Sequence, residues 1–246
     1  MMLRRRVEPE ALDGLAADDP VAEHSRRDLR RVHRCMGTRS LLVREMRRLP
    51  APATGSMRIL ELGAGDGSLL LGVARDLAPS WPPVDLTLLD RIAVVDARTV
   101  ARYGRCGWTV TSSAEDALDW ARAATGSRGS PDAARRWDLV VANLFLHHFD
   151  GPELALLLAA VAASSDGLMA CEPRRGWRAL AGSHLVGAIG ANAVTRGDAV
   201  LSVRAGFRER ELTALWPAPR SRWRLREHAV GAFSHFFGAT RVEANA

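Results

Sequence analysis

The sequence predicts an α/β protein built on a seven-stranded sheet, with five parallel strands, a C-terminal antiparallel pair and helices on both faces. Three observations support this. From residue 57 onward, short apolar runs alternate with segments of helical periodicity, which favours parallel strands joined by right-handed crossovers. The runs are almost continuously apolar, as in a sheet that is covered on both faces. The last two runs are separated by too few residues for a helical crossover, so they should pair antiparallel.

The predicted elements follow one another in a regular order. The parallel strands cover residues 57–62, 84–89, 108–111, 138–142 and 167–171, and the helices between them cover 68–77, 92–103, 115–123 and 153–163. Two further helical stretches, 177–189 and 209–216, precede the antiparallel pair, 223–229 and 233–239. Residues 28–49 have helical periodicity and end at a Pro/Ala-rich linker, 50–55. We therefore divide the chain into an N-terminal helical cap, 1–55, and a main domain, 56–246.

Composition limits the class of protein. The 246 residues suffice for one sizeable α/β domain, and the longest apolar stretch, 154–163, is too short to span a bilayer. No apolar segment follows the N-terminal arginines, so no signal peptide is predicted. Cys35, Cys106 and Cys171 are widely spaced and match no metal-binding spacing. We expect a cytoplasmic protein with reduced thiols, no membrane association and no metal site; the sequence does not give the oligomeric state.

The charge distribution leaves one alternative open. The net charge is +6, and all 34 basic residues are arginines. They are concentrated in the two flanks, whereas the middle of the chain is acidic. Basic flanks can form a nucleic-acid footprint, but they also fit solvated arginines on helix faces. We expect the latter, so a nucleic-acid partner is not favoured.

The strongest motif is the glycine turn at residues 59–68, Ile-Leu-Glu-Leu-Gly-Ala-Gly-Asp-Gly-Ser. Glycines between a strand and a helix allow a tight turn and the close approach of a ligand. A dinucleotide site requires Gly-x-Gly-x-x-Gly, but Ser68 occupies the third position. Glu61 would also repel a pyrophosphate, whereas it would attract a sulfonium or an ammonium group. Both features disfavour a nicotinamide oxidoreductase and favour a positively charged cofactor without phosphates.

With these residues, the sequence resembles the class I, Rossmann-like methyltransferases that use S-adenosyl-L-methionine. The resemblance covers roughly residues 57–240 and implies that the acidic residue after the second strand, Asp90, binds the cofactor's ribose. It implies that Asp116, or alternatively Glu115, accepts from the adenine amino group. The full set of implied cofactor-binding residues is Glu61, Gly63, Ala64, Gly65, Asp90, Arg91, Glu115, Asp116 and Asn143.

The acceptor side carries a weaker resemblance. Residues 144–149, Leu-Phe-Leu-His-His-Phe, and Glu172-Pro173 resemble the branch that methylates small aromatic or phenolic acceptors of secondary metabolism. That resemblance implies an acceptor lid around residues 174–220. A phenol has a pKa of about 10, so a base aids its methylation, and His147 and His148 are the predicted catalytic residues. The alternative is that they only close the loop.

Other possibilities remain at this stage. His184 is a weaker catalytic candidate, while His33, His228 and His235 are predicted to be structural. An RNA methyltransferase acting on ribose or a ring carbon is an alternative, and so is a non-catalytic partner protein with the same fold. The sequence after the fourth strand, Asn-Leu-Phe-Leu, lacks the Pro-Pro-aromatic pattern of enzymes that methylate nucleobase amino groups.

Overall fold

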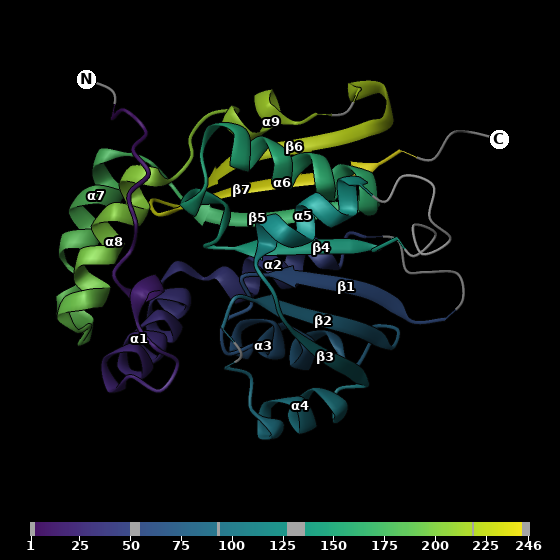
Figure 1. Ribbon diagram of the computed structural model, residues 1–246, viewed down its shortest axis with the longest axis horizontal. Coiled ribbons are helices and arrows are strands. Elements are labelled where there is room, and N and C mark those ends of the chain that lie inside the picture. The colour runs from purple at the N-terminus through teal and green to yellow at the C-terminus, as the bar shows by residue number, and fades with distance from the viewer. Residues whose placement is uncertain (1–2, 50–54, 93, 127–135, 218, 243–246) are drawn as a thin grey trace.

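The computed structural model describes residues 3–49, 55–92, 94–126, 136–217 and 219–242. Its centre is one seven-stranded sheet with the strand order β3-β2-β1-β4-β5-β7-β6 (Figure 1). The strands β1 to β5 pair parallel, whereas β7 pairs antiparallel with both β5 and β6. This confirms the predicted fold class. The strands are β1 (Met57–Leu62), β2 (Val84–Asp90), β3 (Trp108–Ala114), β4 (Leu139–Asn143), β5 (Gly167–Pro173), β6 (Trp223–Val230) and β7 (Ser234–Arg241).

Helices cover both faces because successive strand residues point to opposite sides of the sheet. On β1, Ile59 packs among side chains of α2, α3 and α4, whereas its neighbour Leu60 packs among those of α5, α6 and α9. Each face therefore has its own apolar core. The helices are α1 (Pro20–Met36), α2 (Thr38–Met46), α3 (Ser68–Leu77), α4 (Ala97–Gly104), α5 (Ala117–Gly126), α6 (Gly151–Ser164), α7 (Trp177–His184), α8 (Ala193–Ala205) and α9 (Glu211–Leu215).

The helices differ from the sequence prediction most clearly in three places. The single helix expected over residues 28–49 is two helices, because Gly37 has a φ of +67° and its N–H caps the end of α1. The helix expected from residue 92 begins at Ala97, where the Asp96 carboxylate accepts from the Thr99 N–H. Helix α8 was not predicted as a helix, although Asn192 caps it through the Thr195 N–H.

Three helices gather at the end of the sheet where the parallel strands finish. Figure 1 shows α1, α7 and α8 side by side there, and α8 contacts both of the others. By contrast, α2 packs into the core of the sheet through Leu41, Leu42 and Met46. The predicted boundary between cap and main domain stays a prediction, and its linker lies almost wholly outside the described residues.

No helix in the described ranges combines the length and hydropathy that crossing a membrane requires.

Candidate active site

A cavity of about 550 Å³ opens at the carboxyl ends of the parallel strands. Such edges are where ligands bind in open α/β sheets. All eleven site residues predicted from the sequence line this cavity, together with part of the N-terminal segment. The structure therefore brings the predicted cofactor and catalytic residues to one place; their roles stay predictions.

The glycine turn forms the floor of the cavity. Gly63, Gly65 and Gly67 have φ values of +67°, +54° and +68°, which side-chain-bearing residues rarely adopt. At Gly63 a Cβ atom would also lie 2.2 Å from the ring of Phe145. The Asp90 carboxylate accepts from the Gly65 N–H at 2.8 Å and from the Ile92 N–H at 3.0 Å. Asp90 thus fixes the turn while each of its oxygens keeps a lone pair for a ligand hydroxyl.

Two buried side-chain oxygens in this cavity, both hydrogen-bond acceptors, have no hydrogen-bond partner within the described structure. They are Glu61 Oε2, at the end of β1, and Asn143 Oδ1, at the end of β4. Burial raises the pKa of Glu61 well above its usual value, and the charges of Asp66 and Asp90 raise it further. An unpaired buried acceptor costs free energy, so both atoms favour a ligand that brings hydrogen-bond donors or positive charge. The ammonium group of S-adenosylmethionine meets that requirement.

The predicted adenine side of the cavity is formed by Glu115 and Asp116. One oxygen of Asp116 accepts from the Leu118 N–H at 2.7 Å and caps α5. Glu115 Oε2 lies 3.5 Å from the Ser113 hydroxyl. The predicted preference for Asp116 therefore stays open, because capping already uses part of its carboxylate. The Arg91 guanidinium already has a partner within the protein, because it donates a hydrogen bond to the Asp13 carbonyl at 2.6 Å.

The two adjacent histidines lie where β4 ends. Leu144 has a φ of +48° and turns the chain sharply, so that residues 146–148 form a short 3₁₀ helix at the edge of the sheet. Glu172, at the end of β5, holds this loop: its carboxylate accepts from the backbone N–H groups of Phe145, Leu146 and His147. It also accepts from His147 Nδ1 at 2.8 Å. Glu172 is completely buried, and its bonds to Leu146 and His147 are buried as well.

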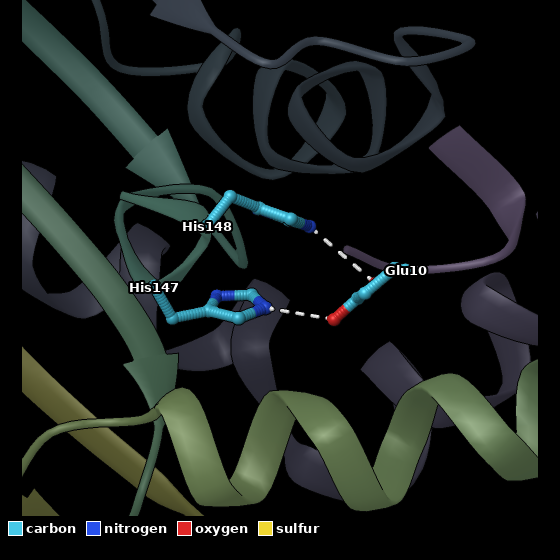
Figure 2. A group of neighbouring side chains, drawn as sticks. All are labelled: Glu10, His147 and His148. Atoms are coloured by element: carbon cyan, nitrogen blue, oxygen red, sulfur yellow. Dashed lines mark hydrogen bonds and ion pairs between the residues drawn. The ribbon is translucent and has the colours of Figure 1, made fainter. Parts of the chain in front are cut away.

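Glu10, which the sequence analysis missed, completes the cluster (Figure 2). His147 Nε2 lies 3.3 Å from Glu10 Oε1, and His148 Nε2 lies 3.4 Å from Glu10 Oε2. Hydrogen bonds from both histidines outweigh the effect of burial and hold the pKa of Glu10 well below its usual range. Burial lowers the pKa of His148, but the hydrogen bond and charge of Glu10 outweigh it and raise that pKa to about 9. We call Glu10, His147 and His148 the Glu–His–His cluster.

The N-terminal segment is fixed in place by residues far along the chain. Arg5 donates to the carbonyls of Ala205 and Phe149, at 2.8 and 2.7 Å. The carboxylate of Asp198 on α8 accepts from the N–H groups of Ala11 and Leu12, at 2.8 and 3.0 Å. These bonds flank Glu10 on both sides and position it over the histidines.

A second, mostly apolar cavity of about 220 Å³ lies between α1, α7 and α8. Its walls include Leu29, Met36, Val186 and Ala199. Five residues line both cavities: Glu10, Leu12, Leu29, Leu144 and Ser202. The two cavities therefore adjoin each other beside the Glu–His–His cluster.

Among the other histidines, His33 also lines the larger cavity, 3.4 Å from the Asn143 amide, and burial lowers its pKa to about 4. His235 is buried and pairs with Glu227 at 2.8 Å. His184 is exposed at the end of α7 and lines neither cavity.

Comparison with known proteins identifies the family. Residues 32–228 match the sequence profile of a family described as a methyltransferase domain. The chain belongs to this methyltransferase family. Its fold and family confirm the predicted class, a class I methyltransferase with S-adenosylmethionine as the cofactor. No curated protein sequence matches the chain.

Similar solved structures share the fold at low sequence identity. The plantazolicin methyltransferase BpumL in complex with SAH is 12% identical to this chain. The match covers 92% of each of the two chains and has a TM-score of 0.60. An O-methyltransferase family protein from Burkholderia thailandensis is 16% identical, with a TM-score of 0.57 over 94% of this chain and 64% of its own. The CMeT domain of the citrinin polyketide synthase is 14% identical. The match has a TM-score of 0.54 and covers 84% of this chain and 52% of the citrinin chain.

Proposed function

We propose that this methyltransferase transfers the methyl group of S-adenosylmethionine to a small organic acceptor, whose apolar body lies in the 220 Å³ cavity and whose reactive group lies beside the Glu–His–His cluster. The observation that carries the proposal is the continuity of the two cavities at Glu10. An apolar cavity with a few convergent polar groups is typical of small-molecule sites. The names of two similar structures, which refer to plantazolicin and citrinin, support an acceptor from secondary metabolism.

The cofactor residues have distinct tasks in this proposal. When bound, S-adenosylmethionine supplies a methyl group on a positively charged sulfur. Glu61 and Asn143 offer their unpartnered oxygens to its donors, and Asp90 accepts from the ribose hydroxyls while it holds the glycine turn. Ala64, Arg91, Glu115 and Asp116 complete the wall of the cavity.

The Glu–His–His cluster is the proposed catalytic group. An acceptor hydroxyl must lose its proton as the new bond to carbon forms, and no other paired histidines line the cavity within the described residues. Glu10 lines both cavities, so an acceptor in the apolar cavity would present its reactive group to the cluster. We propose that His147 and His148 act with Glu10 as one unit that removes this proton.

We also propose a cytoplasmic location, which the free thiols of the three cysteines fit.

The cofactor prediction is tested by calorimetry. We expect S-adenosylhomocysteine to bind and NAD to give no measurable heat. Asp90→Ala should weaken binding by about 1.5–3 kcal/mol, the range for hydrogen bonds to a charged group. Unchanged affinity in this variant would show that the ribose partner is another residue, and NAD binding in place of S-adenosylhomocysteine would contradict the proposal.

The acceptor cavity is tested by filling it. Ala199 on α8 lines the apolar cavity, so Ala199→Trp should raise KM for the acceptor about tenfold or more, the scale on which apolar pockets discriminate size. Acceptors come from a screen of hydroxylated aromatic compounds, with RNA as a comparison, in which a gain of one methyl group is detected by mass spectrometry. The matched control is Ala193→Trp, at an exposed position of the same helix. Equal KM values in the two variants would place the acceptor elsewhere, and methylation of RNA alone would overturn the small-molecule proposal.

A further inference from the structure

The Glu–His–His cluster has the arrangement of a metal site. Within the described part of the chain, it is the one group of three His, Cys, Asp or Glu side chains whose ligand atoms all lie within 4.8 Å of one another. Two imidazoles and one carboxylate are the protein ligands of many catalytic zinc sites and of non-haem iron sites. Figure 2 shows both imidazole rings directed toward the carboxylate from one side.

The separation between each imidazole nitrogen and the carboxylate oxygen that it faces is close to a ligand–ligand distance in tetrahedral coordination. Zinc binds nitrogen and oxygen ligands at about 2.0–2.1 Å, so two ligand atoms of a tetrahedral site lie about 3.3–3.4 Å apart. His147 Nε2 lies 3.3 Å from Glu10 Oε1 and His148 Nε2 lies 3.4 Å from Glu10 Oε2, so each imidazole faces its own oxygen of the carboxylate. This spacing is longer than that of a short hydrogen bond between charged groups, about 2.7–2.9 Å.

The surroundings of each ligand provide independent support. A metal-binding histidine usually donates its other ring N–H to a carboxylate or a backbone carbonyl, which leaves the ligand nitrogen with a free lone pair. His147 Nδ1 lies 2.8 Å from the Glu172 carboxylate, and His148 Nδ1 lies 3.0 Å from the Phe145 carbonyl. These partners are acceptors only, so each Nδ1 carries the hydrogen. Without a cation each Nε2 can also carry a hydrogen and donate it to Glu10; a bound cation would displace these hydrogens and use the two Nε2 lone pairs, which face the carboxylate.

The carboxylate is oriented in the same way. The Ser202 hydroxyl on α8 donates to Glu10 Oε1, and the bonds of Asp198 to Ala11 and Leu12 fix the adjacent backbone. Ligating carboxylates are commonly hydrogen-bonded by such outer partners. Every ligand of the cluster is therefore positioned by a further contact, and His147 is almost fully buried.

From this geometry we propose that Glu10, His147 and His148 bind one divalent cation of the zinc type, with a coordination position left open toward the cavity. The catalytic consequence rests on the proposed function. An acceptor hydroxyl that coordinates the cation through its oxygen has a lowered pKa and releases its proton to water. The resulting oxygen anion forms the new bond to the methyl carbon as the bond from that carbon to sulfur breaks. In this proposal the cluster promotes loss of the proton through the cation, in contrast to the sequence-based expectation of no metal site.

Calorimetry with Zn²⁺ alone tests the site on the full chain after treatment with a chelator. We expect one Zn²⁺ per chain. Glu10→Ala and His148→Ala should weaken binding about a hundredfold or more, and Ser202→Ala about tenfold, as for the loss of an outer partner. The control is His184→Ala, which removes an exposed histidine and should leave the affinity unchanged. Binding of S-adenosylhomocysteine is measured on each variant to show that it is folded.

Substitution with Co²⁺ gives a readout that does not depend on activity, because tetrahedral Co²⁺ absorbs strongly in the visible range. We expect this absorption in the unmodified chain and its loss in Glu10→Ala. No Zn²⁺ binding, or binding that survives in both ligand variants, would overturn the metal proposal and leave the cluster as a hydrogen-bonded ion pair. Acceptor methylation without Zn²⁺ binding would contradict only the metal proposal. Zn²⁺ binding at these residues without methylation of any acceptor would contradict only the proposed function.

Discussion

Replacing Glu172 with alanine is expected to lower the free energy of unfolding by about 3–5 kcal/mol, because several hydrogen-bond donors lose their buried acceptor. The Glu172 carboxylate is completely buried and is the acceptor for three consecutive backbone N–H groups and for His147 Nδ1. Alanine would leave these donors without their acceptor in a region that water does not reach, and each orphaned group costs about 1–3 kcal/mol. The effect should exceed that of an ordinary surface substitution several-fold.

Urea unfolding followed by circular dichroism measures this loss. The matched control is Glu153→Ala, in the first turn of α6, where an exposed carboxylate contributes at most about 1 kcal/mol through the helix dipole. Glu172→Gln separates charge from hydrogen bonding, because an amide oxygen can still accept from Phe145 and Leu146 while its NH₂ group opposes the His147 N–H. A loss below about 1 kcal/mol in Glu172→Ala would show that the loop after β4 holds its shape without this carboxylate.

The sheet could be predicted from the sequence because its signals are local. Short apolar runs such as 139–142 are typical of strands that are covered on both faces, and the short connection at Gly231 permits only an antiparallel pair. The helices were harder to delimit. Gly37 lies inside a stretch with unbroken apolar periodicity, and nothing local distinguishes a tolerated helix glycine from one that ends a helix. Helix α8 has a weak amphipathic pattern, and it contacts both α1 and α7.

The cofactor side of the site could likewise be anticipated, because the carboxyl ends of neighbouring parallel strands meet at one edge. Glu61 on β1, Asp90 on β2 and Asn143 on β4 reach the same cavity for that reason. Glu10 could not be anticipated. It lies 137 residues from His147, in a segment without periodicity. Its position depends on tertiary contacts of Arg5 and Asp198, which no local pattern indicates.

In the folded chain, several of the arginines that make the two flanks basic form contacts within the protein. Several flanking arginines are engaged within the protein: Arg175 is buried and pairs with Glu211, and Arg226 reaches Glu45 at 2.7 Å. Arg5 binds backbone carbonyls. These side chains make structural contacts; the expectation that the basic flanks do not form a nucleic-acid footprint stays a prediction.

The largest effect on turnover is expected at the histidine pair. His148→Gln and His147→Gln should each lower kcat about a hundredfold or more, the usual scale of general acid–base catalysis. Affinity for S-adenosylhomocysteine should change little in His148→Gln, because His148 contacts Glu10 and the Phe145 carbonyl but none of the predicted cofactor-binding side chains. His147 also bonds to Glu172, so its variant needs the unfolding measurement as a check that the loop is intact. His184→Gln is the control that should keep full turnover.

A comparison of acceptors that differ in acidity tests whether this loss of kcat arises from failed proton removal. A phenol with a pKa near 10 is almost entirely neutral at pH 7, so its methylation depends on the cluster. A phenol made acidic by electron-withdrawing substituents is already ionised at that pH and needs no proton removal. The loss of kcat in His148→Gln should therefore be much smaller with the acidic phenol than with the ordinary one. Equal losses with both acceptors would show that His148 positions the acceptor instead, and full turnover in both histidine variants would leave proximity and exclusion of water as the source of catalysis.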